Sequence, residues 1–356
     1  MKREKRYMVW IMMALMTATM AVLLGGCQQV DKTPSITLEG PDTVEITLGE
    51  AYPEHGYSAQ DHQGNDITTK VKLDVPDLSV VGDQFVKYTV TDQGETVTET
   101  RILKNRHKQP PVLAAYEDYD SYEDYAADYE TYTEYLYKGI PILMYHNVYD
   151  PVNPPENLHN NYISTTDLES HLQYLVDENY YFPTWQEVRD FVDCKIDLPE
   201  KSIVLTFDDG SRDFITYGIP ILEKYDIKAT SFVIVSWKGE ELAAMDLHNV
   251  QLQSHSYDMH RGGGNIGHGG VFTALSYEDA MEDLRKSKEI IGNSDAFAYP
   301  FGDYTDYCMQ IIEDAGYLCA VTTVGDKVYP GDNPYALSRL RVSLGDDLEA
   351  FKDMIE

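Results

Sequence analysis

The sequence predicts two folded parts, a small all-β sandwich and a larger α/β domain with a parallel sheet. From residue 139 to residue 356, short apolar segments alternate with helical ones, as in parallel sheets whose strands are joined by helices. Residues 34–105 instead contain short strands of alternating polarity separated by turn residues. A chain of 356 residues is also long enough for about two domains of ordinary size.

The chain begins with a segment that has the features of a secretory leader. Residues 1–6 carry four basic side chains, an apolar run covers residues 8–24, and two glycines precede Cys27. This order is that of a cleaved signal peptide, and the sequence Leu-Gly-Gly-Cys resembles the lipobox of bacterial lipoproteins. We therefore expect residues 1–26 to be a lipoprotein signal peptide, Cys27 to carry the lipid, and residues 27–33 to form a tether. An ordinary signal peptide and a retained membrane helix are the alternatives.

Residues 34–105 have the strand pattern of a small β-sandwich. Val44, Ile46 and Leu48 are apolar while the residues between them are polar, as in a strand with one buried face. The segment 88–92, with the sequence Tyr-Thr-Val-Thr-Asp, resembles Ig-like modules attached to bacterial surface enzymes. The region shows no cluster of catalytic residue types, so we expect it to be a spacer or a binding module.

Residues 106–138 are rich in tyrosine and acid. Eight tyrosines and eight acidic residues lie between Tyr116 and Tyr137, with hardly any aliphatic residue to pack against them. Like charges repel and extend a chain, so this composition favours an extended linker. A strip that binds a metal or a partner is the alternative.

Seven apolar segments after residue 139 are candidate strands of the parallel sheet. They cover residues 140–145, 203–207, 229–235, 250–254, 296–299, 317–323 and 337–342. Helical segments lie between most of them. One helix begins with a capping box at residues 166–169, and His171 lies on its apolar face, where we expect it to be packed. Another begins at Ser276 and ends at Gly292.

Polar residues suited to catalysis follow several of these strands. His146 follows the first strand, and the adjacent Asp208 and Asp209 follow the second. His255 follows the fourth strand, and Phe301 follows the fifth within the sequence Pro-Phe-Gly. Because the carboxyl ends of barrel strands converge on one face, we expect these residues to form one site.

Two histidines and one of the two aspartates make a candidate metal site. Adjacent residues at the end of a strand point in different directions, so one carboxylate can bind a cation while the other acts as a base. His255 and His260 precede a glycine-rich run, which predicts a loop in which both imidazoles can reach one ion. Two imidazoles and one carboxylate form an open zinc-type site. Asp258 and His268 are alternative ligands, and an Asp-Asp-Gly turn with unrelated surface histidines is the non-functional alternative.

Three motifs in this order resemble those of a known family. Residues 206–210, 255–260 and 299–302 are similar to motifs of the polysaccharide deacetylases of carbohydrate esterase family four, the NodB-homology domain. The resemblance covers roughly residues 139–356. It implies a distorted, incomplete (β/α) barrel, in agreement with seven strands rather than eight.

The resemblance also implies a role for each residue that matches a motif. Asp208 corresponds to the general base. Asp209, His255 and His260 correspond to the metal ligands, and the metal in this family is usually zinc. The backbone N–H of Phe301 corresponds to a donor that helps to bind the oxyanion.

The sequence departs from the family pattern in three places. The two histidines are five residues apart rather than four, and Ala298 stands where the family has an arginine. No histidine follows His268 to supply the late general acid. The five-residue spacing resembles the poly-N-acetylglucosamine deacetylase branch, in which the barrel is circularly permuted. That branch implies His146 as the general acid, whereas Ala298 leaves the orientation and pKa of Asp208 without an explanation.

Composition excludes some partners and leaves other features open. With 60 acidic against 28 basic residues, a net charge of −32 excludes nucleic acid as a partner. Cys308 and Cys319 either form a disulfide or remain buried thiols. Trp185 and Trp237 either stack on sugar rings or pack in the core.

The function expected from the sequence is that of a metal-dependent hydrolase. It would remove N-acetyl groups from an N-acetylglucosamine-containing polysaccharide, either an exopolysaccharide or peptidoglycan. We expect it outside the cytoplasm, anchored by lipid to the outer face of a bacterial cell membrane. The alternatives are an O-acetyl esterase with the same residues and a catalytically silent glycan-binding lipoprotein.

Overall fold

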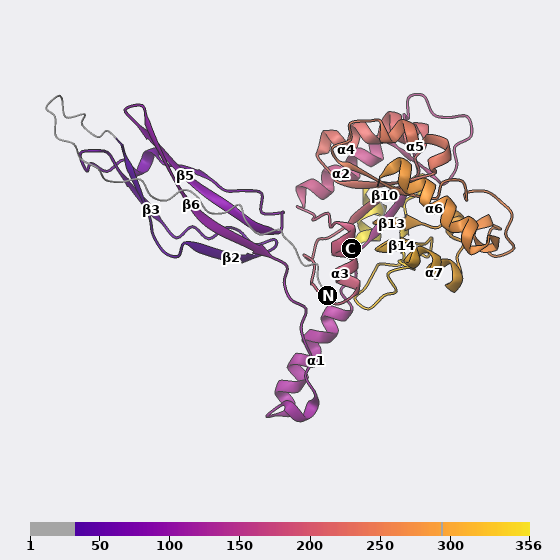
Figure 1. The fold of residues 1–356 in the computed structure, drawn as a ribbon, viewed down its shortest axis with the longest axis horizontal. Coiled ribbons are helices and arrows are strands. Elements are labelled where there is room, and N and C mark those ends of the chain that lie inside the picture. Colours follow the sequence, from indigo (N-terminus) through magenta and orange to yellow (C-terminus); the bar gives the residue numbers. More distant parts are fainter. Residues whose placement is uncertain (1–32, 293–294) are drawn as a thin grey trace, which may run out of the picture. The chain divides into compact units, whose positions relative to one another are not determined.

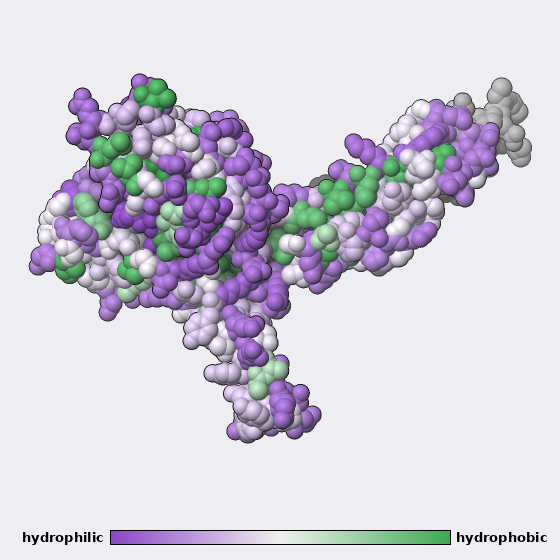
Figure 2. Space-filling model, turned by 180° about the vertical axis from the view of Figure 1, so that it is seen from behind, coloured by the Kyte–Doolittle hydropathy of each residue, from purple (hydrophilic) through white to green (hydrophobic). Residues whose placement is uncertain are grey.

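The computed structural model describes residues 33–292 and 295–356. The predicted signal peptide and Cys27, the predicted site of lipidation, therefore lie outside the described residues. Within these two ranges, no helix is both long enough and apolar enough to cross a membrane. Most of the face visible in Figure 2 is hydrophilic, in keeping with the net charge of −32.

The N-terminal region consists of strands, as the sequence predicts. Strands β1 and β3 pair antiparallel, and a four-stranded sheet has the order β2-β6-β5-β4. Alternation buries Val44 and Ile46 on one face of β2, because a strand turns successive side chains to opposite sides. The elements are β1 Ser35–Leu38, β2 Thr43–Thr47, β3 Tyr57–Gln60, η1 Thr68–Lys70, β4 Lys72–Asp74, β5 Gly82–Asp92 and β6 Glu95–Arg106.

The tyrosine-rich segment contains a helix, so the expectation of an extended linker is wrong for these residues. After the short η2 (Tyr116–Asp118), helix α1 covers Tyr122–Leu136. The Ser121 hydroxyl accepts a hydrogen bond from the N–H of Asp124, and acids in the first turn favour the positive end of the helix dipole. Tyr135 is buried, with its ring centroid 6.4 Å from that of Phe191. Capping and this single buried ring offset the repulsion between the acids.

The second part is built on a seven-stranded parallel sheet (Figure 1), as the sequence predicts. Its order is β14-β13-β12-β11-β10-β7-β15, and each predicted apolar segment contributes one strand. The edge strands are β14 and β15, and an isolated bridge joins Val321 to Leu337. The sheet is thus an incomplete barrel. Its strands are β7 Ile142–Tyr145, β10 Val204–Asp209, β11 Ala229–Val233, β12 Val250–Ser254, β13 Ala296–Ala298, β14 Cys319–Val321 and β15 Leu340–Arg341.

Helices connect these strands, and their ends follow local sequence signals. Ser276 caps α6 and Gly292 ends it with a φ of +70°, as predicted. The cap of α2 lies earlier than predicted, because Ser164 rather than Thr166 accepts the hydrogen bond from the N–H of Asp167. The helices are α2 Thr165–Asp177, α3 Trp185–Val192, α4 Ile219–Tyr225, α5 Val235–Ala243, α6 Tyr277–Ile291, α7 Asp306–Asp314 and α8 Leu348–Ile355. Short elements are β8 Asn147–Tyr149, β9 Tyr162–Ser164, η3 Phe214–Gly218, η4 Val271–Ala274 and η5 Pro300–Gly302.

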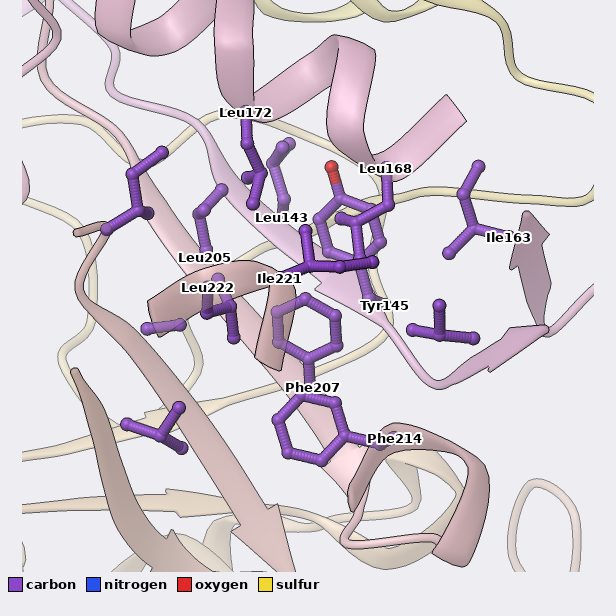
Figure 3. Packing of buried hydrophobic residues seen from close by; sticks show 14 of the residues in the cluster. Leu143, Tyr145, Ile163, Leu168, Leu172, Leu205, Phe207, Phe214, Ile221 and Leu222 are labelled. Atoms are coloured by element: carbon purple, nitrogen blue, oxygen red, sulfur yellow. The ribbon is translucent and has the colours of Figure 1, made fainter. Parts of the chain in front are cut away.

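A core of aliphatic and aromatic side chains packs between the sheet and α2 (Figure 3). The ring of Phe207 stacks on Tyr145 at 4.8 Å and on Phe214 at 4.6 Å. Stacked and offset rings add a specific geometry to the apolar area that they bury. This cluster fixes the direction of β7 and β10, the two strands whose carboxyl ends position His146 and Asp208.

The structure answers whether Cys308 and Cys319 form a disulfide and whether the two tryptophans pack in the core. Cys308 and Cys319 are both buried and both free, so they do not form a disulfide. Trp185 is a core residue, 3% exposed, and its indole N–H donates to the hydroxyl of Thr230. Trp237, in contrast, is 60% exposed.

His171 is packed in the core, as expected, where it contacts α8 and the residues just before this helix. Its ring stacks on Phe351 at 4.1 Å, and Nε2 lies 3.1 Å from the carbonyl oxygen of Asp346. The hydroxyl of Tyr145 lies 3.3 Å from Nδ1. Burial lowers the pKa of His171, so the ring is packed in its neutral form.

We expect His171→Ala to lower the free energy of unfolding by about 2–4 kcal/mol, because it removes a stacked ring and two hydrogen bonds. Since the folded pKa is depressed, this stabilisation is present above the unfolded pKa of about 6.5 and is lost as the pH falls. Urea unfolding between pH 5 and pH 8 measures both effects. The exposed His248→Ala is the matched control. An equal loss at all pH values would contradict the neutral packing of His171.

Candidate active site

The register of the strands brings the predicted residues together. Tyr145 pairs with Phe207, so His146 and Asp208, the next residues, leave neighbouring strands side by side. Asp209 pairs with Val233 of β11, and Val233 with Ser254 of β12, which places His255 on the same rim, two strands away from Asp209. The side chains of the site therefore lie together at the carboxyl ends of β7, β10 and β12.

Asp209, His255 and His260 form a cluster that could hold a cation. One ligand atom from each lies within 4.8 Å of the other two. Oδ1 of Asp209 is 3.6 Å from Nε2 of His255 and 3.7 Å from Nε2 of His260. Asp209 has a φ of +73°, a conformation unusual for a residue with a side chain. This turn sends its carboxylate away from that of Asp208, which has the preceding position on the strand.

The donor atoms of this cluster have the form that a divalent cation requires. Nδ1 of His255 lies 2.7 Å from the carbonyl oxygen of Ala298, which holds the proton on Nδ1 and leaves Nε2 free. Burial lowers the pKa of His255 to about 3, so the ring is neutral. Burial and the carboxylate of Asp208 raise the pKa of Asp209 to about 7. A bound cation would offset the cost of ionising the buried Asp209 beside Asp208. Two neutral imidazoles and one carboxylate are a donor set that suits zinc.

The two alternative ligands lie outside the cluster. Asp258 is exposed, and its carboxylate contacts Ser236 and Arg261. His268 is 76% exposed and lies 3.4 Å from the carboxylate of Asp303. Neither side chain belongs to the group whose ligand atoms meet.

Asp208 is paired with an arginine that the sequence did not single out. Nη1 and Nη2 of Arg339 donate to the two carboxylate oxygens of Asp208, both at 2.7 Å. Arg339 also donates to the hydroxyl of Thr206 and to the carbonyl oxygen of Thr322. Although burial acts in the opposite direction, Arg339 holds the pKa of Asp208 far below its usual range. Asp208 is therefore an ionised carboxylate in a fixed orientation.

His146 lies on the other side of Asp208. Its Nε2 is 4.0 Å from Oδ2 of Asp208. Burial, only partly opposed by the charge of Asp208, lowers the pKa of His146 to about 4. Nδ1 is buried and has no hydrogen-bond partner among the described residues. Burial therefore favours the neutral form of this ring in the free protein.

Phe301 reaches the same rim from the loop after β13. Its φ of +62° is rare for an aromatic residue, and such strained residues concentrate at functional sites. The turn is held by the N–H of Gly302, which donates to the carbonyl oxygen of Tyr299 at 2.9 Å. The ring of Phe301 lies 4.2 Å from that of His260. The main chain at Phe301 is thus fixed beside the cluster.

Two parts of the chain match described families. Residues 195–320 match the family described as "Polysaccharide deacetylase", and residues 36–104 match "Bacterial surface protein, Ig-like domain". This chain carries a polysaccharide deacetylase domain. It is preceded by an Ig-like domain, as the strand pattern predicted.

Individual relatives agree with this assignment. The chain is 28% identical over 229 residues to YxkH of Bacillus subtilis, whose name also refers to polysaccharide deacetylases; the match covers 61% of this chain and 76% of that protein. It is 26% identical over 218 residues to a Staphylococcus aureus poly-β-1,6-N-acetyl-D-glucosamine N-deacetylase, covering 54% of this chain and 71% of the relative. The deacetylase domain is therefore that of a hydrolase acting on carbon–nitrogen bonds, the class expected from the sequence.

Solved structures show the same fold. The Streptococcus pyogenes deacetylase PplD, solved in complex with acetate, superposes with a TM-score of 0.51 at 26% identity, covering 61% of this chain and 98% of PplD. A polysaccharide deacetylase of Bacillus cereus superposes with a TM-score of 0.50 at 20% identity, covering 78% of each chain. The second likeness concerns the fold alone.

Arg339 accounts for the departure that the sequence left unexplained. The deacetylase domain has Ala298 where the family has an arginine, and the cation comes instead from the segment just before β15. Arg339 stands inside the last candidate strand, 131 residues from Asp208, next to the polar Ser338 and close to a second arginine, Arg341. A buried arginine needs a partner, but the sequence does not show which acid supplies it.

We expect His260→Ala to abolish zinc binding, because it removes one of three donors. In the unaltered chain, zinc at about a hundred times its Kd should stabilise the fold by about 2.7 kcal/mol. Thermal unfolding with and without zinc, and metal content after dialysis, measure this difference. His268→Ala, a histidine outside the cluster, is the control. Zinc retained by His260→Ala and lost by His268→Ala would refute the cluster.

We expect Arg339→Met to lower the free energy of unfolding by about 3–5 kcal/mol, because it leaves a buried carboxylate without its cation. The double variant Arg339→Met with Asp208→Asn should lose less, since no buried charge remains. Urea unfolding of both variants gives the coupling. The exposed Arg341→Met should change stability by less than about 0.5 kcal/mol. Additive losses in the double variant would show that the two residues do not act as a pair.

Proposed function

We propose that the domain is a metal-dependent N-deacetylase of an N-acetylglucosamine-containing polysaccharide of the cell envelope. The observation that carries the proposal is the pairing of Asp208 with Arg339 next to the cluster of Asp209, His255 and His260. The two neighbouring carboxylates have different tasks, since one is held by an arginine and the other faces two neutral imidazoles.

The substrate follows from the relatives and from the site together. The Staphylococcus aureus relative is named for poly-β-1,6-N-acetyl-D-glucosamine, which supports a polymer of this sugar as substrate. An exopolysaccharide and the glycan of peptidoglycan both present such acetamido groups. An ester of acetate would meet the same residues, so amide and ester substrates have to be compared directly.

Asp209, His255 and His260 would hold the metal, and zinc suits this donor set. When bound, the metal would polarise the acetyl carbonyl group and lower the pKa of water. The residues around it then need only to position the substrate and to move protons.

Asp208 is the general base in this proposal. It is fixed by Arg339 and takes a proton from the water that attacks the acetyl carbon. The N–H of Phe301 donates to the oxygen of the acetyl group as negative charge develops there. The strained but well-held turn at Phe301 would keep that N–H in place before the substrate arrives.

His146 is the general acid in this proposal. Its Nε2 lies 4.0 Å from Oδ2 of Asp208, so the two groups face the same reacting centre. The proton that Asp208 takes from water is transferred to Nε2 of His146. From there it passes to the nitrogen of the leaving amine, and acetate and a glucosamine unit result.

We also propose an arrangement along the chain. A lipid on Cys27 would anchor the protein to the outer face of a bacterial cell membrane, with residues 27–33 as the tether. The Ig-like domain at residues 34–105 would serve as a spacer, residues 106–138 as the connection, and residues 139–356 as the catalytic domain. The leader sequence and the Ig-like match support this order.

We expect Asp208→Asn to lower kcat for acetate release by about 100- to 10,000-fold while zinc remains bound, because the base is lost and the ligands are kept. Acetate release from β-1,6-linked N-acetylglucosamine oligomers, from peptidoglycan fragments and from acetylated xylan measures both rate and substrate class. Asp258→Asn, on the same rim but outside the cluster, is the control. Turnover retained by Asp208→Asn would sink the proposed mechanism, and turnover of the xylan ester alone would sink the proposed substrate.

A further inference from the structure

An exposed tryptophan stands on the rim between the strands that supply the cluster. Trp237 lies in the first turn of α5, which begins directly after β11. Strand β11 pairs with β10, which carries Asp209, and with β12, which precedes His255. Trp237 is 60% exposed although it is the largest kind of side chain. An exposed tryptophan gives up the favourable free energy that a core tryptophan gains by burying its apolar surface.

The backbone around Trp237 is held firmly. The N–H groups of Val235 and Ser236 donate to the carbonyl oxygens of Ser256 and Tyr257, at 3.0 and 2.9 Å. The N–H of Trp237 donates to the carbonyl oxygen of Ile234 at 2.9 Å. The loop that carries the two histidines thus fixes the start of α5. A platform held in this way loses little freedom when a ligand binds.

Trp237 contacts the cluster from the solvent side. Its ring centroid is 6.0 Å from that of His260, at an interplanar angle of 64°. Exposure of the side chains rises along this path, from 3% at His255 through 16% at His260 to 60% at Trp237. An acetyl group must enter far enough to meet the buried end of this path. The part of the substrate beside Trp237 is then either the sugar that carries the acetyl group or the sugar next to it.

The chemistry of the indole suits a sugar ring. Among residues 33–292 and 295–356, the indole N–H of Trp237 meets no hydrogen-bond acceptor, whereas that of Trp185 is bonded to Thr230. An aromatic face packs well against the C–H groups of a pyranose, and a free N–H can donate to a hydroxyl group. Single exposed aromatic residues are common, so the position beside the cluster carries the argument rather than the exposure alone.

We propose that Trp237 is a specificity-determining residue, whose indole face packs against a pyranose ring of the substrate polymer. This inference rests on the proposed function and adds to it. The domain selects glycans by a sugar contact outside the reacting centre, and a small acetylated compound without a ring cannot make this contact.

The test compares a glycan with a ring-free acetyl ester. For Trp237→Ala we expect KM for β-1,6-linked N-acetylglucosamine oligomers to rise about 2- to 10-fold, the size of an aromatic contact. The ratio of kcat/KM for the glycan to kcat/KM for a short alkyl acetate should fall by the same factor. Trp237→Tyr should restore most of the ratio, and Trp237→Leu, apolar but without a ring, should not.

Controls separate this contact from support of His260. Zinc content is measured in every variant. Tyr307→Ala, which removes an exposed aromatic residue on α7, a helix that carries none of the site residues, should leave the ratio unchanged. An unchanged ratio in Trp237→Ala, an equal loss on both substrates, or a loss of zinc would overturn the inference. If the unaltered chain releases acetate from no glycan, the proposed function fails as well; if it does release acetate, only the role of Trp237 is at stake.

Discussion

The buried ion pair between Arg339 and Asp208 is the contact on which both the fold and the proposed chemistry depend. Two charges removed from water are costly, and they persist only where geometry and further hydrogen bonds compensate. Arg339 meets that condition because it makes a bidentate pair of hydrogen bonds with the carboxylate of Asp208 and further hydrogen bonds with Thr206 and Thr322. Thr322 follows the edge strand β14, and Arg339 precedes the other edge strand, β15. One side chain therefore connects the segments beside both edge strands of the open barrel to the interior strand β10, and the same contact orients the carboxylate of Asp208.

The two neighbouring carboxylates show how one strand end supports two kinds of chemistry. Asp208 is kept ionised by a cation, whereas burial beside another negative charge raises the pKa of Asp209 to about 7. The difference comes from the surroundings, because the residue type and the strand are the same. The positive φ at Asp209 separates the two environments, so a local feature of the backbone underlies the division.

Much of this arrangement could be predicted because its signals are local. Continuous apolar runs mark the seven strands, and polar residues directly after a run mark the rim, so His146, Asp208 and His255 could be placed on one face. Long-range partnerships left no local trace. Arg339 is 131 residues from Asp208, and nothing in the segment around it names the partner. Helix α1 was missed for a related reason: its pattern has hardly any aliphatic residues, and its one buried ring, Tyr135, packs against Phe191, which is distant in the sequence.

The position of β7 in the sheet bears on how the domain folds. It is the first strand of the domain in the sequence, yet its neighbours are β10 and β15, the last strand. Loop-closure entropy opposes such distant pairings, and high contact order slows folding. During synthesis from the N-terminal end, β7 can pair with β10 on one edge. Its other edge stays unpaired until Leu340–Arg341 have been synthesised. A chain that stops early would leave an apolar edge open to other chains, which is a route to aggregation. The strand that precedes the proposed acid His146 thus depends on a partner, Leu340–Arg341, about 200 residues further along the chain.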